Sequence, residues 1–288
     1  MTAATYQMPA ELQERILPLQ EPRVQRTSAG TSRDGAFPAV PGLNGACIRR
    51  AVCQKDLVAA YRFVRKSRVA LGYPAPEPAI LWPDPAEGPR EIATFVAKAW
   101  PDVVGTTSLL LDSQDQQLPA DIVFPELGEV RQPGRLVAEL TNRATVPAYF
   151  RTNAPNDLIR CCVAHGQFVG CSDLLAVIRP WEQAGFAALG FRQVGPVRSS
   201  GGAVPEPVAL ARLDLLSLQA DGGTPRLDGT DLSLLWQFYL KANPYIEHVK
   251  AWAALIEKET QAGRIGPEAE AVLADDGGAE SEVLKAAV

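Results

Sequence analysis

Cysteine is scarce in this sequence, and its cysteines follow no pattern. The chain has five of them, an odd number at irregular spacing: Cys47, Cys53, Cys161, Cys162 and Cys171. A small secreted domain held together by disulfides carries an even number of cysteines at regular spacing. That class is excluded, and free thiols in the reducing cytoplasm are expected.

Long hydrophobic runs and an excess of positive charge are absent as well. No apolar run approaches the ~20 residues that cross a bilayer, and the first 20 residues lack the basic start and apolar stretch of a secretory signal. The formal net charge is −5, so no attraction to nucleic acid or to anionic membranes is expected. A hydrophobic content of 47% over 288 residues is enough for the core of one large domain or two small ones.

Composition divides the chain into a main domain and flanking segments. Residues 1–43 are predicted to be a disordered tail and 276–288 a frayed end. The main domain is predicted over 44–218. A glycine-rich linker begins the segment 219–275, in which two helices are predicted with a break at Asn243–Pro244. Aromatic residues make up only 7% of the chain, yet five of them gather there and must dock on the main domain or on a partner: Trp236, Phe238, Tyr239, Tyr245 and Trp252.

Hydrophobic periodicity in the main domain predicts alternating strands and helices. Strands are predicted at 46–52, 91–100, 103–113, 134–146, 171–180, 191–198 and 206–218. Helices or helical turns are predicted at 54–72, 118–131, 153–168 and 181–191, with Asn153 as the N-cap of the third. This order predicts an α/β (α+β) fold, in which a mixed sheet has helices on its faces.

The strand predicted at 134–146, GRLVAELTNRATV, raises a question about its polar residues. Strand alternation puts Glu139, Thr141 and Arg143 on one face, and Leu140 and Asn142 on the other. A one-residue bulge would instead bring Asn142 to the face of Glu139. Such a polar face either keeps a surface strand soluble or lines an active site, where a carboxylate moves protons and an arginine binds anions.

A second cluster of reactive side chains lies on the helix predicted at 153–168. Cys161 and His165 are four residues apart on one face of this helix, and Cys171 follows closely. A zinc site or a Cys–His nucleophile can be drawn from them, but no fourth ligand is evident. Because cysteines in a helix interior more commonly act as small apolar side chains, no metal is predicted.

Four stretches match known motifs in order. They are YRFVRKSRVALGY at 61–73, GTTSLLLDSQDQQLPADIVFPELGEVR at 105–131, GRLVAELTNRATV at 134–146, and the pair IRPWEQAGFAALGF and PEPVALARLDL at 178–191 and 205–215. Together they resemble the GNAT superfamily of N-acyltransferases, and more narrowly the long-chain N-acyl amino acid synthases and their acyl-homoserine-lactone synthase relatives. The resemblance covers roughly residues 46–216. It implies a GNAT-like, mostly antiparallel central sheet flanked by helices, to which the C-terminal helices are an addition.

The resemblance also implies an activity and its residues. A fatty acyl group would move from an acyl-acyl carrier protein, or from acyl-CoA, to the amine of an amino acid or similar small molecule. Glu139 matches the family glutamate beside the thioester and is the candidate general base, with Arg143 as the candidate anion-binding residue. Further residues of the matched motifs are predicted to bind the substrate or the acyl group: Tyr61, Arg62, Arg68, Thr106, Thr107 and Asn142.

The segment 147–158, PAYFRTNAPNDL, bears on the acyl donor. CoA-dependent GNAT enzymes carry a glycine-rich turn at this junction, whose N–H groups hold the pyrophosphate, and this segment has no glycine. A donor without nucleotide phosphates, such as an acyl carrier protein, is therefore expected, with no cofactor beyond the thioester itself. Four arginines are predicted to form the basic patch that an acidic carrier needs: Arg131, Arg135, Arg151 and Arg160.

Two departures from the family pattern keep other interpretations open. Asn142 stands where the family has an arginine, and Arg179 stands where it has a histidine. A catalytically degenerate GNAT-fold module that binds an acyl group or a protein is therefore the alternative hypothesis. A CoA-dependent acetyltransferase with an atypical loop is a third.

Overall fold

The computed structural model describes residues 40–41, 46–52, 54–70, 92–99, 102–113, 117–150, 152–200, 205–220 and 232–261. These residues contain an eight-stranded sheet of order β1-β2-β3-β4-β5-β6-β8-β7. The strands are β1 (Val40–Pro41), β2 (Cys47–Arg50), β3 (Ile92–Ala99), β4 (Asp102–Leu111), β5 (Val137–Thr145), β6 (Asp173–Ile178), β7 (Arg192–Ser199) and β8 (Pro207–Asp214). Neighbouring strands pair antiparallel, except that β5 and β6 pair parallel. The predicted mixed, mostly antiparallel sheet is confirmed.

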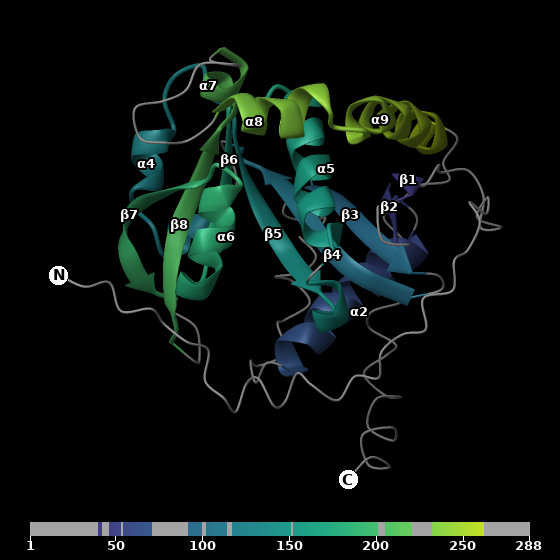
Figure 1. Cartoon of the computed structure of the whole chain (residues 1–288), viewed down its shortest axis with the longest axis horizontal. Coiled ribbons are helices and arrows are strands. Elements are labelled where there is room, and N and C mark those ends of the chain that lie inside the picture. Colours follow the sequence, from purple (N-terminus) through teal and green to yellow (C-terminus); the bar gives the residue numbers. More distant parts are fainter. Residues whose placement is uncertain are drawn as a thin grey trace, which may run out of the picture.

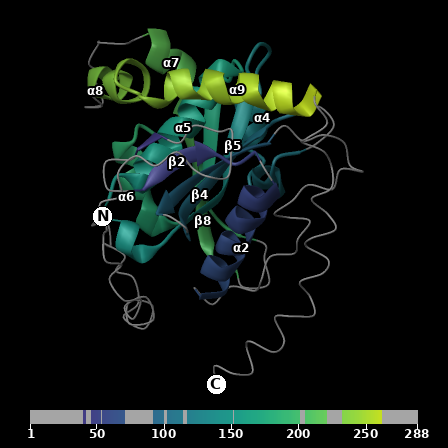
Figure 2. The same cartoon turned by 90° about the vertical axis from the view of Figure 1, so that its right-hand side faces the viewer.

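Helices cover both faces of this sheet (Figures 1 and 2). The α-helices are α2 (Gln54–Ala70), α4 (Leu127–Val130), α5 (Ala154–Phe168), α6 (Gln183–Ala188), α7 (Leu215–Ala220), α8 (Leu232–Trp236) and α9 (Tyr245–Gln261). Short 3-10 turns are η2 (Pro119–Ile122), η3 (Pro147–Tyr149) and η4 (Pro180–Glu182), and η5 (Gln237–Lys241) is a π-helical turn. The largest apolar cluster contains residues of β3, β4, β5, α5 and α9, and a second lies between β4, β5, β8 and the η2–α4 segment. Each face of the central strands therefore has its own core.

Two local details differ from the sequence prediction. Asn153 stands at the N-cap position of α5, but its side chain makes no capping hydrogen bond, and Thr152 Oγ1 instead accepts from the Ala154 N–H at 3.2 Å. The last strand ends at Asp214 rather than at 218, because the Asp214 carboxylate accepts from the Ser217 N–H at 2.9 Å and begins α7.

The C-terminal helices dock on the main domain, chiefly on α5. Tyr239, Tyr245 and Trp252 are fully buried in the large apolar cluster. Arg160 of α5 donates to the carbonyls of Phe238 and Ala242. This interface therefore combines apolar burial with charged hydrogen bonds to the end of η5, where the helices break as predicted.

Several predicted features lie outside the described residues. They include the linker after 220, the end of the first helix at Gly72 and the frayed end 276–288. Of the predicted tail 1–43, only the strand β1 is described, paired with β2. Within the described ranges, none of the helices has the length and apolar character needed to cross a membrane.

Replacing Trp252 tests how strongly the C-terminal helices stabilise the domain. Trp252→Ala removes a fully buried indole, and the free energy of unfolding should fall by about 3–5 kcal/mol in urea titrations. Leu234→Ala, at a side chain 62% exposed on neighbouring α8, is the control and should change it by less than about 0.5 kcal/mol. Equal effects of the two substitutions would show that α9 is not part of the folded core.

Candidate functional site

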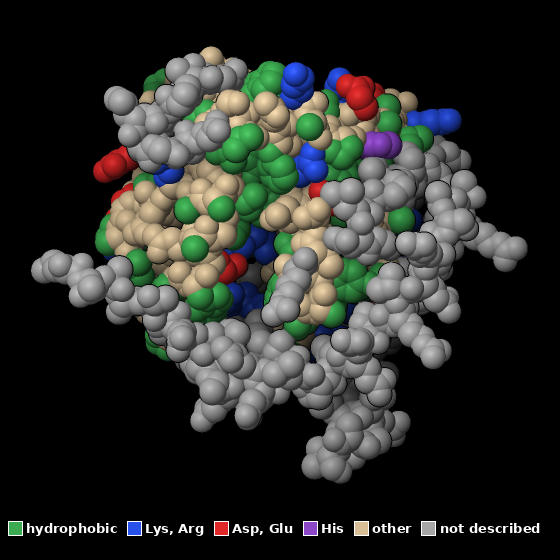
Figure 3. All heavy atoms as spheres, in the orientation of Figure 1, with side chains coloured by type: hydrophobic (Ala, Val, Ile, Leu, Met, Phe, Trp, Pro, Cys, Tyr) green, Lys and Arg blue, Asp and Glu red, His purple; other side chains and the backbone are tan. Residues whose placement is uncertain are grey.

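The two parallel strands at the centre of the sheet separate part of the way along. β5 and β6 pair only from Val137–Asp173 to Leu140–Ala176. Beyond that point β5 stays paired with β4, and β6 with β8, so the two halves of the sheet diverge (Figure 1). Figure 3 shows a hollow at this place, with basic and acidic side chains on its walls.

A β-bulge lies where β5 leaves β6. Thr106 pairs with Ala144 but Ser108 pairs with Thr141, so two residues of β5 face the single Thr107. Asn142 has φ 49°, a left-handed conformation that asparagine tolerates better than most residues. Its Nδ2 lies 3.5 Å from Ser108 Oγ. Of the two arrangements predicted for this strand, the bulge is the one formed, and it brings Asn142 to the Glu139 face.

The bulge can free a backbone donor for the opening. The Asp112 N–H donates to the Val137 carbonyl at 2.9 Å, so by antiparallel alternation Glu139 and Thr141 also bond toward β4. The residues between them, Ala138 and Leu140, bond toward β6. A bulge leaves one peptide group out of the ladder, and where β6 has diverged that group can donate to an oxyanion.

Glu139 lies beside the apex of the opening, on the face that α2 and α4 cover. Its carboxylate is buried, and Oε2 accepts from the Ala120 N–H at 3.0 Å. Its partners on the neighbouring strands are apolar, Leu110 and Leu175. Burial raises the pKa of Glu139 to about 7 and Asp121 adds to the rise, while the Ala120 N–H and Arg143 oppose it. A carboxyl group with this pKa can both accept and release a proton near neutrality.

Arg143 spans the diverging strands. Its Nη2 donates to the Val177 carbonyl of β6 at 2.8 Å, and Nη1 lies 3.1 Å from Glu182 Oε1. Its guanidinium also lies over the Phe186 ring, 4.7 Å from the centroid. Although burial raises the pKa of Glu182, Arg143 brings it below its ordinary value. Because of the bulge, Arg143 turns toward η4 and α6 instead of standing beside Glu139.

Buried hydroxyl groups lie under α2 next to Asn142. Together with Glu139 and Asn142 they form what we call the polar strip. Tyr61 of α2 is buried and hydrogen-bonds Thr94, and Thr94 Oγ1 lies 2.9 Å from Ser108 Oγ. Burial raises the pKa of Tyr61. Sequence reasoning missed Thr94 and Ser108, and the only signal for them was a hydroxyl side chain within each of two apolar strands.

The other predicted binding residues do not converge on Glu139. Arg62 and Arg68 are exposed on α2. Thr106 and Thr107 are buried in β4, where their hydroxyls donate to the carbonyls of Phe95 and Thr106 at 3.0 and 2.8 Å. Of the predicted set, only Tyr61 and Asn142 therefore belong with Glu139 to one polar strip.

The basic patch predicted from four arginines is wrong for the three that the structure describes. Arg131 pairs with Asp112 and Asp121, and Arg135 pairs with Asp173. Arg160 is buried against Asp157 and the C-terminal helices. These cations are used inside the domain, and Arg151 lies outside the described residues.

The cysteine and histidine cluster of α5 is part of the core. His165 is buried, and its ring centroid lies 5.9 Å from that of Phe95. Burial lowers the pKa of His165 to about 3, helped by Arg50, and burial raises the pKa of the Cys161 thiol. Among the described residues no group of three or more potential ligands is arranged to hold a metal ion.

Known proteins resemble this chain in sequence and in structure. A family model described as N-acyl amino acid synthase FeeM matches residues 59–214. The structure of FeeM, an N-acyl amino acid synthase from uncultured soil microbes, matches with 26% identity and a TM-score of 0.52, covering 59% of this chain and 91% of FeeM. The Escherichia coli ribosomal-protein-S18-alanine N-acetyltransferase shares 16% identity, with a TM-score of 0.41 and coverage of 59% and 93%. An N-acetyltransferase of Staphylococcus aureus Mu50 shares 17% identity, with a TM-score of 0.42 and coverage of 59% and 98%. A search of curated proteins found no match.

The raised pKa of Glu139 predicts how stability depends on pH. The folded pKa is about 7 against 4.5 for the free side chain, so the folded state binds more protons between these values. Stability from this group is complete below pH 4.5 and is lost as pH rises through 7, by about 3 kcal/mol in all. Glu139→Gln cannot titrate at this position. Its free energy of unfolding should therefore rise relative to that of the unaltered protein as the pH increases from 4.5 to about 7. A difference between the two proteins that does not change with pH would contradict the assignment.

Proposed function

The chain belongs to the N-acyl amino acid synthase FeeM family and is an acyltransferase, and we propose that it transfers a fatty acyl group from an acyl-acyl carrier protein to the amine of an amino acid or similar small molecule. The observation that carries the proposal is a buried carboxylate with a pKa near neutrality at the apex of the β5–β6 opening. Such a group is suited to take the proton of an attacking amine.

The proposed reaction proceeds by addition and elimination at the thioester carbonyl. Glu139 takes a proton from the substrate ammonium, directly or through one water, and the freed amine forms the C–N bond. Negative charge develops on the carbonyl oxygen, where the bulge at Asn142 offers a backbone N–H donor. The C–S bond then breaks, the thiolate takes the proton that Glu139 returns, and the amide nitrogen releases its second proton to Glu139 and from there to solvent.

The start of α5 supports a carrier protein over CoA as the donor. A pyrophosphate is held by free N–H groups in the first turn of a helix. Here the Ala154 N–H donates to Thr152 Oγ1, and Pro155 has no N–H. The helix therefore offers few donors to a nucleotide.

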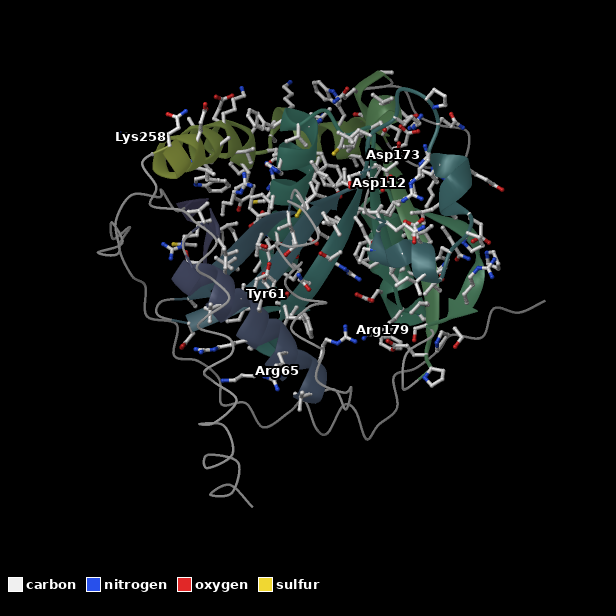
Figure 4. The ribbon with its side chains drawn as sticks, turned by 180° about the vertical axis from the view of Figure 1, so that it is seen from behind. Tyr61, Arg65, Asp112, Asp173, Arg179 and Lys258 are labelled. Carbon is white, nitrogen blue, oxygen red and sulfur yellow. The ribbon has the colours of Figure 1, made fainter. Side chains whose placement is uncertain are left out.

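The exposed side of α2 supports a docking site for an acidic carrier. Four cations within seven residues are exposed there: Arg62, Arg65, Lys66 and Arg68. Figure 4 shows Arg65 on α2 and Arg179 beyond β6 at the same end of the molecule, on either side of the diverging strands. An acidic partner drawn to α2 would bring its phosphopantetheine arm to the opening.

A cytoplasmic location goes with this proposal, and the four described cysteines are free thiols, as a reducing compartment requires.

Removing the proposed base should abolish turnover while keeping the fold. Glu139→Gln should lower the acylation rate ~100-fold or more, because the amide cannot take the proton. The assay combines long-chain acyl-carrier protein with pooled amino acids and detects N-acyl products by mass spectrometry. Glu129→Gln, at an exposed position on α4, is the control. An unchanged rate in Glu139→Gln would remove the base assignment, and acyl binding without turnover in the unaltered protein would favour a degenerate binding module.

Reversing charge on α2 should weaken the use of the carrier protein. Arg65→Glu with Lys66→Glu should raise KM for acyl-carrier protein about fivefold or more at low salt, and less at high salt. Turnover with a short acyl-pantetheine thioester should not change, because it is too small to reach the exposed side chains of Arg65 and Lys66. Lys250→Glu on α9 is the matched surface control. If KM for the carrier protein does not change, docking on α2 is wrong.

A further inference from the structure

One arginine joins three segments near the candidate base. Arg131 follows α4, and its Nε and Nη2 donate to the two Asp112 carboxylate oxygens at 2.6 and 2.9 Å. Its Nη1 and Nη2 also donate to the two Asp121 oxygens, both at 2.6 Å. Asp112 follows β4 and Asp121 belongs to η2, so the guanidinium holds η2 and the end of α4 against the sheet. The two carboxylates raise the pKa of Arg131, which keeps it charged.

The segment held in this way supplies the hydrogen-bond donor of Glu139. Ala120, whose N–H donates to Glu139, is the residue before Asp121 in η2. Asp121 also accepts from the Leu118 N–H at 2.8 Å, which fixes the turn around Ala120. Leu118 and Ala120 are buried in the apolar cluster of that face. A displacement of Asp121 would therefore move the donor of Glu139.

The same arginine controls the charge next to Glu139. Asp121 from η2 and Arg143 from β5 are the charged groups that act on Glu139. Leu110 and Leu175 stand beside it on β4 and β6, and α2 contributes Tyr61 to this face. Without Arg131, Asp121 would act on Glu139 with no guanidinium bound to it.

We propose that Arg131 is a positioning residue for Glu139: it holds the Ala120 N–H against the carboxylate and neutralises the charge of Asp121 beside it. The inference rests on the proposed function only where it concerns turnover. Loss of Arg131 would keep Glu139 protonated at neutral pH, where a protonated carboxyl group cannot act as a base. Activity would then return at higher pH, which a loss caused by misfolding would not do.

The ion pair of Arg131 with Asp121 is called the clamp below. Substitutions at its two ends have opposite expected effects. Arg131→Gln should raise the pKa of Glu139 by about one unit, because Asp121 is left unneutralised. Asp121→Asn should lower it by about one unit, because the negative charge is gone while the amide oxygen can still accept from Leu118. Arg198→Gln is the control: it removes a 2.5 Å ion pair to Glu126 in the same segment, and should leave the pKa unchanged.

The titration of Glu139 is measured without substrate by NMR, from the chemical shift of the side-chain carboxyl ¹³C in glutamate-labelled protein. The resonance of Glu139 is assigned as the one that is missing in Glu139→Gln. In parallel, the pH profile of kcat/KM should shift in the same direction as the titration in each variant. A purely structural role for Arg131 would let water reach Glu139, and the pKa would fall in both variants. That result, or no shift in either variant, would overturn the proposal.

Failure of the clamp and failure of the proposed function have different signatures. If the titration shifts as expected but the unaltered protein makes no N-acyl product, the clamp holds and the proposed function fails. If Arg131→Gln does not fold, Asp121→Asn can still overturn the proposal, because a pKa of Glu139 that does not fall in that variant contradicts it.

Discussion

The candidate site depends on the parallel pairing of β5 with β6, which ends after Leu140 and Ala176. Each strand keeps an antiparallel neighbour on its other side, β4 for one and β8 for the other, so the two can part without losing their place in the sheet. The bulge at Asn142 bends β5 at this point. Arg143 then reaches across to the Val177 carbonyl and satisfies an acceptor that the lost pairing leaves. An opening is thereby built into the middle of an otherwise continuous sheet.

Two buried carboxylates of this sheet show what separates a structural acid from a reactive one. Asp173 is fully buried, and burial acts to raise its pKa, yet hydrogen bonds from Arg135, Ser172 and Arg212 leave that pKa below its ordinary value. Glu139 is just as deeply buried but has one backbone donor and apolar neighbours, so its pKa rises to about 7. The arginine donors keep Asp173 ionised, whereas Glu139 has no cationic hydrogen-bond donor to offset its desolvation. Of these two acids, Glu139 is the one able to exchange a proton near neutral pH.

The order of elements could be predicted from the sequence because periodicity is a local property. The hairpin of β3 and β4, the buried strand β6 and the helix break at Asn243 all follow from residues close in sequence. Glu139 could be selected because it matches the glutamate of a family motif. Thr94 and Ser108 could not, because single hydroxyl residues are common in strands and only the register places these two side by side.

The sequence by itself determined the fold class and, through motifs that resemble those of a known family, the candidate base, since a motif depends on residue types at short spacing. The tertiary structure alone decided what the charges do. Arg131 could have faced a carrier protein, but the fold brings Asp112 and Asp121 to it, and its charge is paired within the domain. The tertiary structure also decided that β5 forms a bulge, because a bulge is defined by pairing with β4. Contacts between residues distant in the chain have no periodic signal, so the roles of these charged side chains appear only in the folded protein.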